Sequence, residues 1–422
     1  MRSGARNSAL ALACCCLGAG FFSNPARVAS LMTGPAGVTG SVWETTDVGA
    51  VWSDNFDRGS LGTNWVIVNS ANATIVGNEL LFNQTDVDLT RRVYYLPWRT
   101  CSDHWTLRWS QRFSAMDGDS YGVAVGILNS QAGGGNDRGY NAVLWGAGTD
   151  VGSMEIQRWD GASQNSVTIG PALALAAGNV VDCWLTRSGW TITATASNRA
   201  NSQVSTTSMV FSDAAGLIAP TISRVCFYPL QGAVYVDNVS FTIDRRKPAR
   251  YLLIGDSISE GYNATAYSNT FISVVQSNFT EAVCNDSGSF NTTSNSVSLL
   301  PEILAHQPGT AVLMIGGNDV QFGYPTSQWQ TQYSNLVAQL QTNGVKVKHC
   351  LATPRNGVDL RPLNNWITAT YPAGDVIDTW TPLVTNDYSL NPAYEGAGPD
   401  GGSHPNDAGH LLIGQIIRTN LP

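Results

Sequence analysis

Charged residues are scarce in this chain of 422 residues, because Asp, Glu, Lys and Arg together make up only 13% of it. The net charge of −8 is spread along the chain without a block of like charge. Nucleic acid and anionic membrane surfaces select basic clusters, so we expect neither as a partner. Ser, Thr, Asn and Gly fill the polar positions instead, a composition typical of β-rich extracellular or virion proteins. We therefore predict a secreted, extracellular or virion-associated protein.

Cysteine pairs with metal-like or redox spacing are also absent. Past the N-terminal region the chain has five cysteines, none in a CxxC pair: Cys101, Cys183, Cys226, Cys284 and Cys350. An odd number leaves at least one thiol unpaired unless it bonds another chain, so cysteine usage leaves the redox compartment open.

No apolar run is long enough to span a bilayer. The uncharged stretch Ala9 to Phe22 follows Arg2 and Arg6, which is the order of charged and apolar regions in an export signal. No small-x-small cleavage site follows it. We predict an export leader within residues 1–30, a linker over residues 31–51 and no membrane span.

Short alternating segments such as NWVIVN, HWTLRWSQRF and TITATAS fill residues 52–245, and polar, glycine-rich turns separate them. This rhythm predicts an antiparallel β-sandwich of the jelly-roll type. The first and last segments, DNFDRGSLGTNWVI and VYVDNVSFTI, resemble strands of laminin-G/concanavalin-like jelly rolls. The tryptophans of this half form either a sugar-stacking platform or the sandwich core, and both alternatives stay open: Trp105, Trp109, Trp145 and Trp159.

The charged, proline-containing stretch IDRRKPAR at residues 243–250 marks the predicted domain boundary. Over residues 246–422 strand-like and helix-like segments alternate, which predicts a parallel sheet with helices on both faces. Ligands bind such sheets at the carboxyl ends of the strands. The stretch YLLIGDSISEGY therefore places Ser257 where an active site is expected. A serine here is either a helix cap or a nucleophile, and the second glycine of the α/β-hydrolase elbow is missing.

Later strands end in further residues of catalytic type. LMIGGNDV places Asn318 directly after a buried strand, CNDSGSFNTT places Gly288 in a small-residue loop, and PDGGSHPNDAGH places Asp400 and His404 before the last helix. Acyl transfer needs a nucleophile, a base, a group that orients the base, and donors for the oxyanion. All four types are present.

These four blocks, in this order, resemble the SGNH hydrolases, the GDSL-type esterase/lipase family, over about residues 250–422. The resemblance implies a flavodoxin-like α/β fold with Ser257 as nucleophile and His404 as general base. It also implies an oxyanion hole made of the Ser257 and Gly288 amides and the Asn318 side chain. No cofactor is implied.

The acidic residue departs from the family pattern, because Asp400 precedes His404 by four positions and the family spacing is three. We expect Gly401 and Gly402 to absorb the extra residue as a bulge, which keeps Asp400 as the orienting acid. Asp407 is the rival, but it falls in the first turn of the predicted last helix, where the helix dipole already favours a carboxylate.

The remaining polar candidates are interpreted as structural. Asp256 and Asp319 are expected to hold their loops through bonds to the backbone, and the other histidines of this half are expected to be structural: His306, His349 and His410. No cluster of histidines and carboxylates stands at ligand spacing, so we expect no metal.

The sequence thus predicts a serine esterase, and O-deacetylation of a carbohydrate is the favoured reaction. The partner would be an acylated, most simply acetylated, carbohydrate. A lipase or aryl-ester esterase is the alternative within the enzyme class. From another class, a non-catalytic glycan-binding or virion adhesion protein stays open, as does the oligomeric state.

Overall fold

The structure is a computed structural model that describes residues 50–69, 71–86, 91–95, 104–116, 121–128, 137–161, 163–210, 224–243, 249–279, 283–288, 290–385, 388–396 and 402–422. The predicted export leader and nearly all of the predicted linker lie outside these ranges. Within them, every helix is too short or too polar to cross a membrane.

Two antiparallel sheets make up the N-terminal half, as the alternating segments predict. In the described residues the first sheet has the order β13-β12-β11-β6-β15-β4-β3, with β1 paired to β15. Its strands are β1 (Ala50–Asp54), β3 (Ala73–Val76), β4 (Glu79–Gln84), β6 (His104–Phe113), β11 (Val181–Ser188), β12 (Thr191–Asn198), β13 (Val204–Val210) and β15 (Gly232–Ile243). The second sheet has the order β10-β9-β8-β7-β14-β5-β2. Its strands are β2 (Trp65–Val68), β5 (Arg92–Tyr95), β7 (Val123–Leu128), β8 (Asp137–Leu144), β9 (Met154–Gly161), β10 (Ser163–Ile169) and β14 (Arg224–Pro229).

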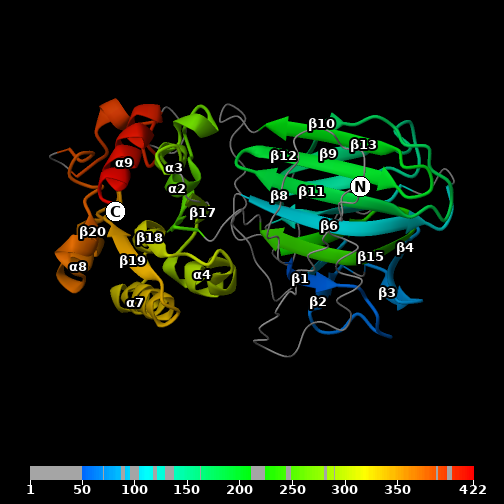
Figure 1. Ribbon diagram of the computed structural model, residues 1–422, viewed down its shortest axis with the longest axis horizontal. Coiled ribbons are helices and arrows are strands. Elements are labelled where there is room, and N and C mark those ends of the chain that lie inside the picture. The colour runs from blue at the N-terminus through cyan, green and yellow to red at the C-terminus, as the bar shows by residue number, and fades with distance from the viewer. Residues whose placement is uncertain are drawn as a thin grey trace, which may run out of the picture. The chain divides into compact units, whose positions relative to one another are not determined.

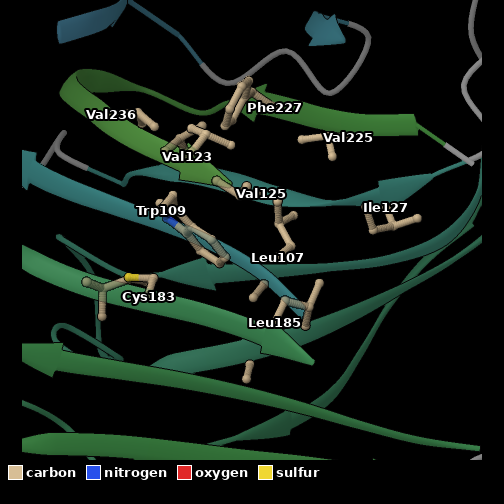
Figure 2. Packing of buried hydrophobic residues seen from close by; sticks show 14 of the residues in the cluster. Leu107, Trp109, Val123, Val125, Ile127, Cys183, Leu185, Val225, Phe227 and Val236 are labelled. Atoms are coloured by element: carbon tan, nitrogen blue, oxygen red, sulfur yellow. The ribbon is translucent and has the colours of Figure 1, made fainter. Parts of the chain in front are cut away.

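The core of this half lies between the two sheets, because alternate residues of each strand point inward. In β11, buried and half-buried residues alternate along the whole strand. Figure 2 shows Leu107 and Trp109 of β6 in the same cluster as Val125 of β7 and Phe227 of β14. The β-sandwich prediction is confirmed.

Two of the four tryptophans belong to this core. Trp105 and Trp109 are 2% and 1% exposed, so the core alternative is confirmed for them. Trp145 is half-buried outside this core, and its Nε1 donates to Oε2 of Glu155 at 2.5 Å. The side chain of Trp159 is not among those that the structure describes.

The C-terminal half contains a parallel sheet with the order β17-β16-β18-β19-β20 among the described residues. The strands are β16 (Tyr251–Gly255), β17 (Val283–Ser287), β18 (Thr310–Met314), β19 (Lys346–Cys350) and β20 (Val376–Ile377). This is the flavodoxin-like order, with its switch point between β16 and β18. Every residue of β16 and β18 is buried, as expected for central strands covered on both faces. The flavodoxin-like prediction is confirmed.

Helices cover both faces of the parallel sheet (Figure 1). Leu253 packs with α3 and α9 on one face, whereas Leu252 packs with α5, α7 and α8 on the other. The helices of the two faces are α3 (Phe271–Gln276), α9 (Asp407–Thr419), α5 (Leu300–Ala305), α7 (Thr326–Thr342) and α8 (Arg361–Thr370).

His349 of β19 is a structural residue, as predicted. It is 2% exposed, its ring stacks on Tyr371 at 3.8 Å between centroids, and its Nδ1 lies 3.0 Å from the Tyr333 hydroxyl. The pKa of His349 is lowered from 6.5 to about 4, chiefly by burial; Asp375 opposes this shift and Lys348 adds to it.

We expect this histidine to make the fold sensitive to acid. Between pH 6.5 and about 4 the unfolded chain binds a proton that native His349 does not, so the free energy of unfolding falls as the pH falls. His349→Gln should shrink that fall by on the order of 3 kcal/mol. Urea unfolding at a series of pH values measures it, and parallel curves for the two proteins would contradict it.

Candidate active site

The register of the parallel sheet brings three loops to one edge. Gly255, the last residue of β16, pairs with Ser287 of β17 and with Met314 of β18. The chain that follows each strand therefore starts at the same level, at the carboxyl edge where such sheets bind ligands. Ser257 and Gly288 lie within two residues of this row.

Ser257 is the first residue of the short helix α2 (Ser257–Glu260). The capping side chain is that of Asp256, whose Oδ1 accepts from the backbone N–H of Ile258 at 3.1 Å. The helix-cap alternative for Ser257 is therefore wrong, and its hydroxyl is available for other contacts. The turn is tight, since a Cβ on Gly255 would meet the side chain of Ser259 and would lie 2.9 Å from the carbonyl oxygen of Met314.

His404 meets Ser257 across 147 positions of sequence, and its Nε2 lies 2.7 Å from the serine Oγ. The imidazole packs against the ring of Tyr262 at 4.3 Å between centroids. Its loop is held by the N–H of Gly396, which donates to the carbonyl of His404 at 3.0 Å. Just beyond, Asn406 caps α9 by accepting from the N–H of Gly409. The predicted nucleophile and base are thus within hydrogen-bond reach of each other.

Of the two candidate acids, Asp400 lies outside the described residues, so its contact with His404 stays a prediction. Asp407 is fully engaged elsewhere. Its Oδ1 accepts from the N–H of Thr265 at 2.8 Å, and its Oδ2 accepts from Oγ1 of Thr265 at 2.6 Å and from Nδ2 of Asn269 at 2.9 Å. Burial pushes the pKa of Asp407 upward, but these hydrogen bonds outweigh it and lower the pKa.

Asn318 stands in the first turn of α6 (Gly317–Gln321), directly after β18, and is 3% exposed. Its Nδ2 donates to the carbonyl of Asn291 at 2.8 Å, and its Oδ1 accepts from Arg355 at 2.6 Å. A carboxamide carries two N–H donors, so one remains for a ligand. Gly288, after β17, is also buried, and the N–H of Asn291 closes that loop onto the Gly288 carbonyl at 3.0 Å.

Arg355 is a site residue that the sequence reasoning missed. It follows β19 in the stretch LATPRN, and its Nη2 donates to Oδ2 of Asp256 at 2.5 Å, with both side chains less than 5% exposed. A basic residue just beyond a strand, at the predicted ligand edge of a chain so poor in charge, is the signal that could have identified it.

The residues interpreted as structural have such roles here. Asp319 accepts from the N–H of Thr293 at 3.0 Å and from its Oγ1 at 2.7 Å. Burial raises the pKa of Asp319, and these bonds oppose the shift. His410 is buried, and its Nε2 donates to the Tyr262 carbonyl at 3.0 Å. Burial lowers the pKa of His410 to about 4, so it is neutral near pH 7.

One group of metal-ligand residue types does come together, which corrects the statement that no such cluster exists. Glu302 in the first turn of α5 and His306, its C-cap, meet Asp286 of β17, with ligand-type atoms within 4.8 Å of one another. All three are buried, and each has further interactions. These three residues form a buried polar cluster. Neither Ser257 nor His404 belongs to it.

The sequence of the C-terminal half also matches a known family. Residues 253–412 match the GDSL-like lipase/acylhydrolase family. The match begins in β16, ends in α9 and includes Ser257, Asn318 and His404. The match supports a hydrolase that acts on esters in this part of the chain.

Solved structures resemble each half separately, at low identity. A G-D-S-L family protein from Desulfitobacterium hafniense is 21% identical, over 40% of this chain and 98% of its own, with a TM-score of 0.38. A GDSL-like lipase from Bacteroides thetaiotaomicron is 20% identical, over 41% of this chain and 88% of its own, with a TM-score of 0.35. The acidic lectin of winged bean is 13% identical, over 47% of this chain and 99% of its own, with a TM-score of 0.36. No curated protein matches the sequence.

Because three hydrogen bonds from Thr265 and Asn269 already hold the carboxylate of Asp407, we expect Asp407→Asn to leave esterase kcat within about twofold of the wild type. The melting temperature should fall slightly, since a charged acceptor is lost. Asp400→Asn is the matched comparison, and we expect it to lower kcat by orders of magnitude. A large loss in Asp407→Asn with none in Asp400→Asn would reassign the acid.

Proposed function

We propose that this protein is a serine esterase that hydrolyses carboxylic esters through an acyl-enzyme on Ser257. The observation that carries the proposal is the 2.7 Å contact between Ser257 Oγ and His404 Nε2 at the carboxyl edge of the sheet. The family match over residues 253–412 supports the same class of reaction.

In the first half-reaction, His404 Nε2 takes the hydroxyl proton while Ser257 Oγ attacks the ester carbonyl carbon. The carbonyl π electrons move onto oxygen and form a tetrahedral oxyanion. When this intermediate collapses, the bond to the alkoxy oxygen breaks, and His404 returns the proton to the leaving alcohol. The acyl group remains on Ser257.

In the second half-reaction, His404 takes a proton from water, which attacks the acyl carbon, and Ser257 leaves with that proton as the acid is released. The backbone N–H groups of Ser257 and Gly288 and the free N–H of Asn318 are the proposed donors to the oxyanion in both halves. Ser257 suits this role because the first N–H groups of a helix have no partner within the helix. Asp400 is the proposed partner of the second imidazole nitrogen, which would fix the tautomer.

The favoured substrate is an acetylated carbohydrate. Two exposed aromatic residues are backbone neighbours of the Asn318 region. Phe290, 53% exposed, precedes Asn291, whose carbonyl accepts from Asn318, and Phe322, 44% exposed, follows Asn318 by one helical turn. Aromatic rings pack well against the C–H faces of sugars, although they would also receive an aryl or lipid group. Relative kcat/KM on acetylated xylan, an aryl acetate and a long-chain aryl ester separates these substrates.

The alternative from another class is a glycan-binding or adhesion protein without catalysis, secreted or carried on a virion. A scaffold of that kind has no need for a serine hydroxyl 2.7 Å from an imidazole. Turnover of a simple acetyl ester by the purified protein decides between the two classes.

Ser257→Ala should lower kcat on a short-chain aryl ester by on the order of 10⁴-fold or more, because nucleophile and base act as a unit. Folding should be intact, since Asp256 caps the helix. Ser259→Ala in the same helix is the matched control: its Oγ is buried without a hydrogen-bond partner, so activity should persist. Wild-type turnover by Ser257→Ala would refute the mechanism.

Asn318→Ala removes one oxyanion donor and should lower kcat by about 10²- to 10³-fold with little change in KM. Steady-state kinetics on the same ester measure both constants. An effect confined to KM would show that Asn318 binds the substrate without stabilising the transition state.

A further inference from the structure

Arg355 connects two parts of the proposed site that come from different strands. One guanidinium nitrogen, Nη2, donates to Oδ2 of Asp256, the residue before the nucleophile, at 2.5 Å. The other, Nη1, donates to Oδ1 of Asn318 at 2.6 Å and to Oε1 of Gln321 at 2.8 Å. Asp256 follows β16, Asn318 follows β18, and Arg355 itself follows β19.

The contact with Arg355 fixes which way the Asn318 amide faces. A guanidinium has only donors, so the amide group turned toward it must be the carbonyl oxygen. The opposite orientation would place the NH₂ group against Nη1, donor to donor, inside a buried site. With Oδ1 held in this way, the NH₂ group must point away from Arg355, where one N–H meets the Asn291 carbonyl at 2.8 Å.

The guanidinium packs closely against the start of α6. A Cβ at Gly317, the residue before Asn318, would lie 2.8 Å from Nη2 and 3.0 Å from Cζ of Arg355. Only a glycine lets the planar group lie this close to the start of α6. Asp256 balances the buried charge, and its other oxygen caps α2. A lysine could not reproduce this arrangement, because an ammonium group lacks the fixed fork that meets two partners in one plane.

We propose that Arg355 is a positioning residue that orients the Asn318 amide, so that its free N–H faces the developing oxyanion, and ties that donor to the nucleophile turn through Asp256. The proposal rests on the proposed esterase function for its catalytic consequence. The orientation of the Asn318 amide is a property of the protein alone.

A double-mutant cycle tests the catalytic part. Arg355→Lys should lower kcat by about 10- to 100-fold with a small change in KM, less than the loss in Asn318→Ala. If Arg355 acts through Asn318, the double variant should be no slower than Asn318→Ala alone. Losses that multiply would overturn the proposal. Absence of turnover in the wild type would instead refute the esterase function.

The side-chain amide signals of Asn318 test the orientation without any substrate. These ¹⁵N–¹H signals, assigned by their loss in Asn318→Ala, should shift and exchange faster with solvent in Arg355→Lys. Unchanged signals would overturn the proposal even if activity fell. Gln321→Ala is the control: it removes an exposed partner of Arg355 and should leave both the Asn318 signals and kcat nearly unchanged.

Should Arg355→Lys fail to fold, Asp256→Asn/Arg355→Met removes both buried charges together and leaves neither unpaired. The asparagine can still cap α2. The same shift of the Asn318 signals and the same lack of additivity with Asn318→Ala are expected, and independent losses would count against the proposal.

Discussion

The parallel register of β16 with its two neighbours is the constraint on which the candidate site depends. Gly255, Ser287 and Met314 form one row across three strands, and the nucleophile turn, the Gly288 loop and α6 all start from that row. A slip of one residue in a strand would turn every side chain of that strand to the other face of the sheet. Both faces are packed, so the register is strongly specified, and the site inherits its precision from the hydrophobic core.

Buried charge is the second constraint, and it acts on the same loops. In a chain with few charged residues, the Asp256 and Arg355 pair is almost completely removed from water. Losing one partner of such a pair costs about 3–5 kcal/mol, whereas replacing both together can be nearly neutral. The pair is therefore weak evidence for stability, but Arg355 also donates to Asn318 of α6, so one side chain links the starts of α2 and α6. The proposed oxyanion hole, with donors at the starts of both helices, requires such a relation.

The histidine is placed by a different device. The loop that carries His404 has no place in the sheet, and it is fixed by backbone bonds to Gly396 and by the cap of Asn406 on α9. On the other side, Asp407 binds the segment that contains Thr265 and Asn269, which follows α2. The start of α9 is thus tied to the chain just beyond α2, the helix that begins with Ser257.

Much of this could be predicted from residue order alone. In the first half, polar and apolar residues alternate with period 2, which indicates antiparallel sheets buried on one face. In the second half, whole strands alternate with helices, which indicates a parallel sheet buried on both faces. Ser257, Gly288, Asn318 and His404 could be proposed as site residues from the sequence, because each stands within a few residues of a strand end or a helix start, where sequence punctuation is strongest. The resemblance of their four blocks to the GDSL-type family supplied the role proposed for each.

Other features were decided only by the tertiary structure. Three such features are the contacts of Arg355, the hydrogen bonds of Asp407 with Thr265 and Asn269, and the meeting of Asp286 with His306. All of them depend on pairings between residues well separated in the chain. Local propensity carries no information about such pairs. Residue order by itself determined which strands form and which residues stand at their ends; the packing of helices on the two sheet faces decided which of those residues touch, because distance in a folded chain is set by the core and not by sequence separation.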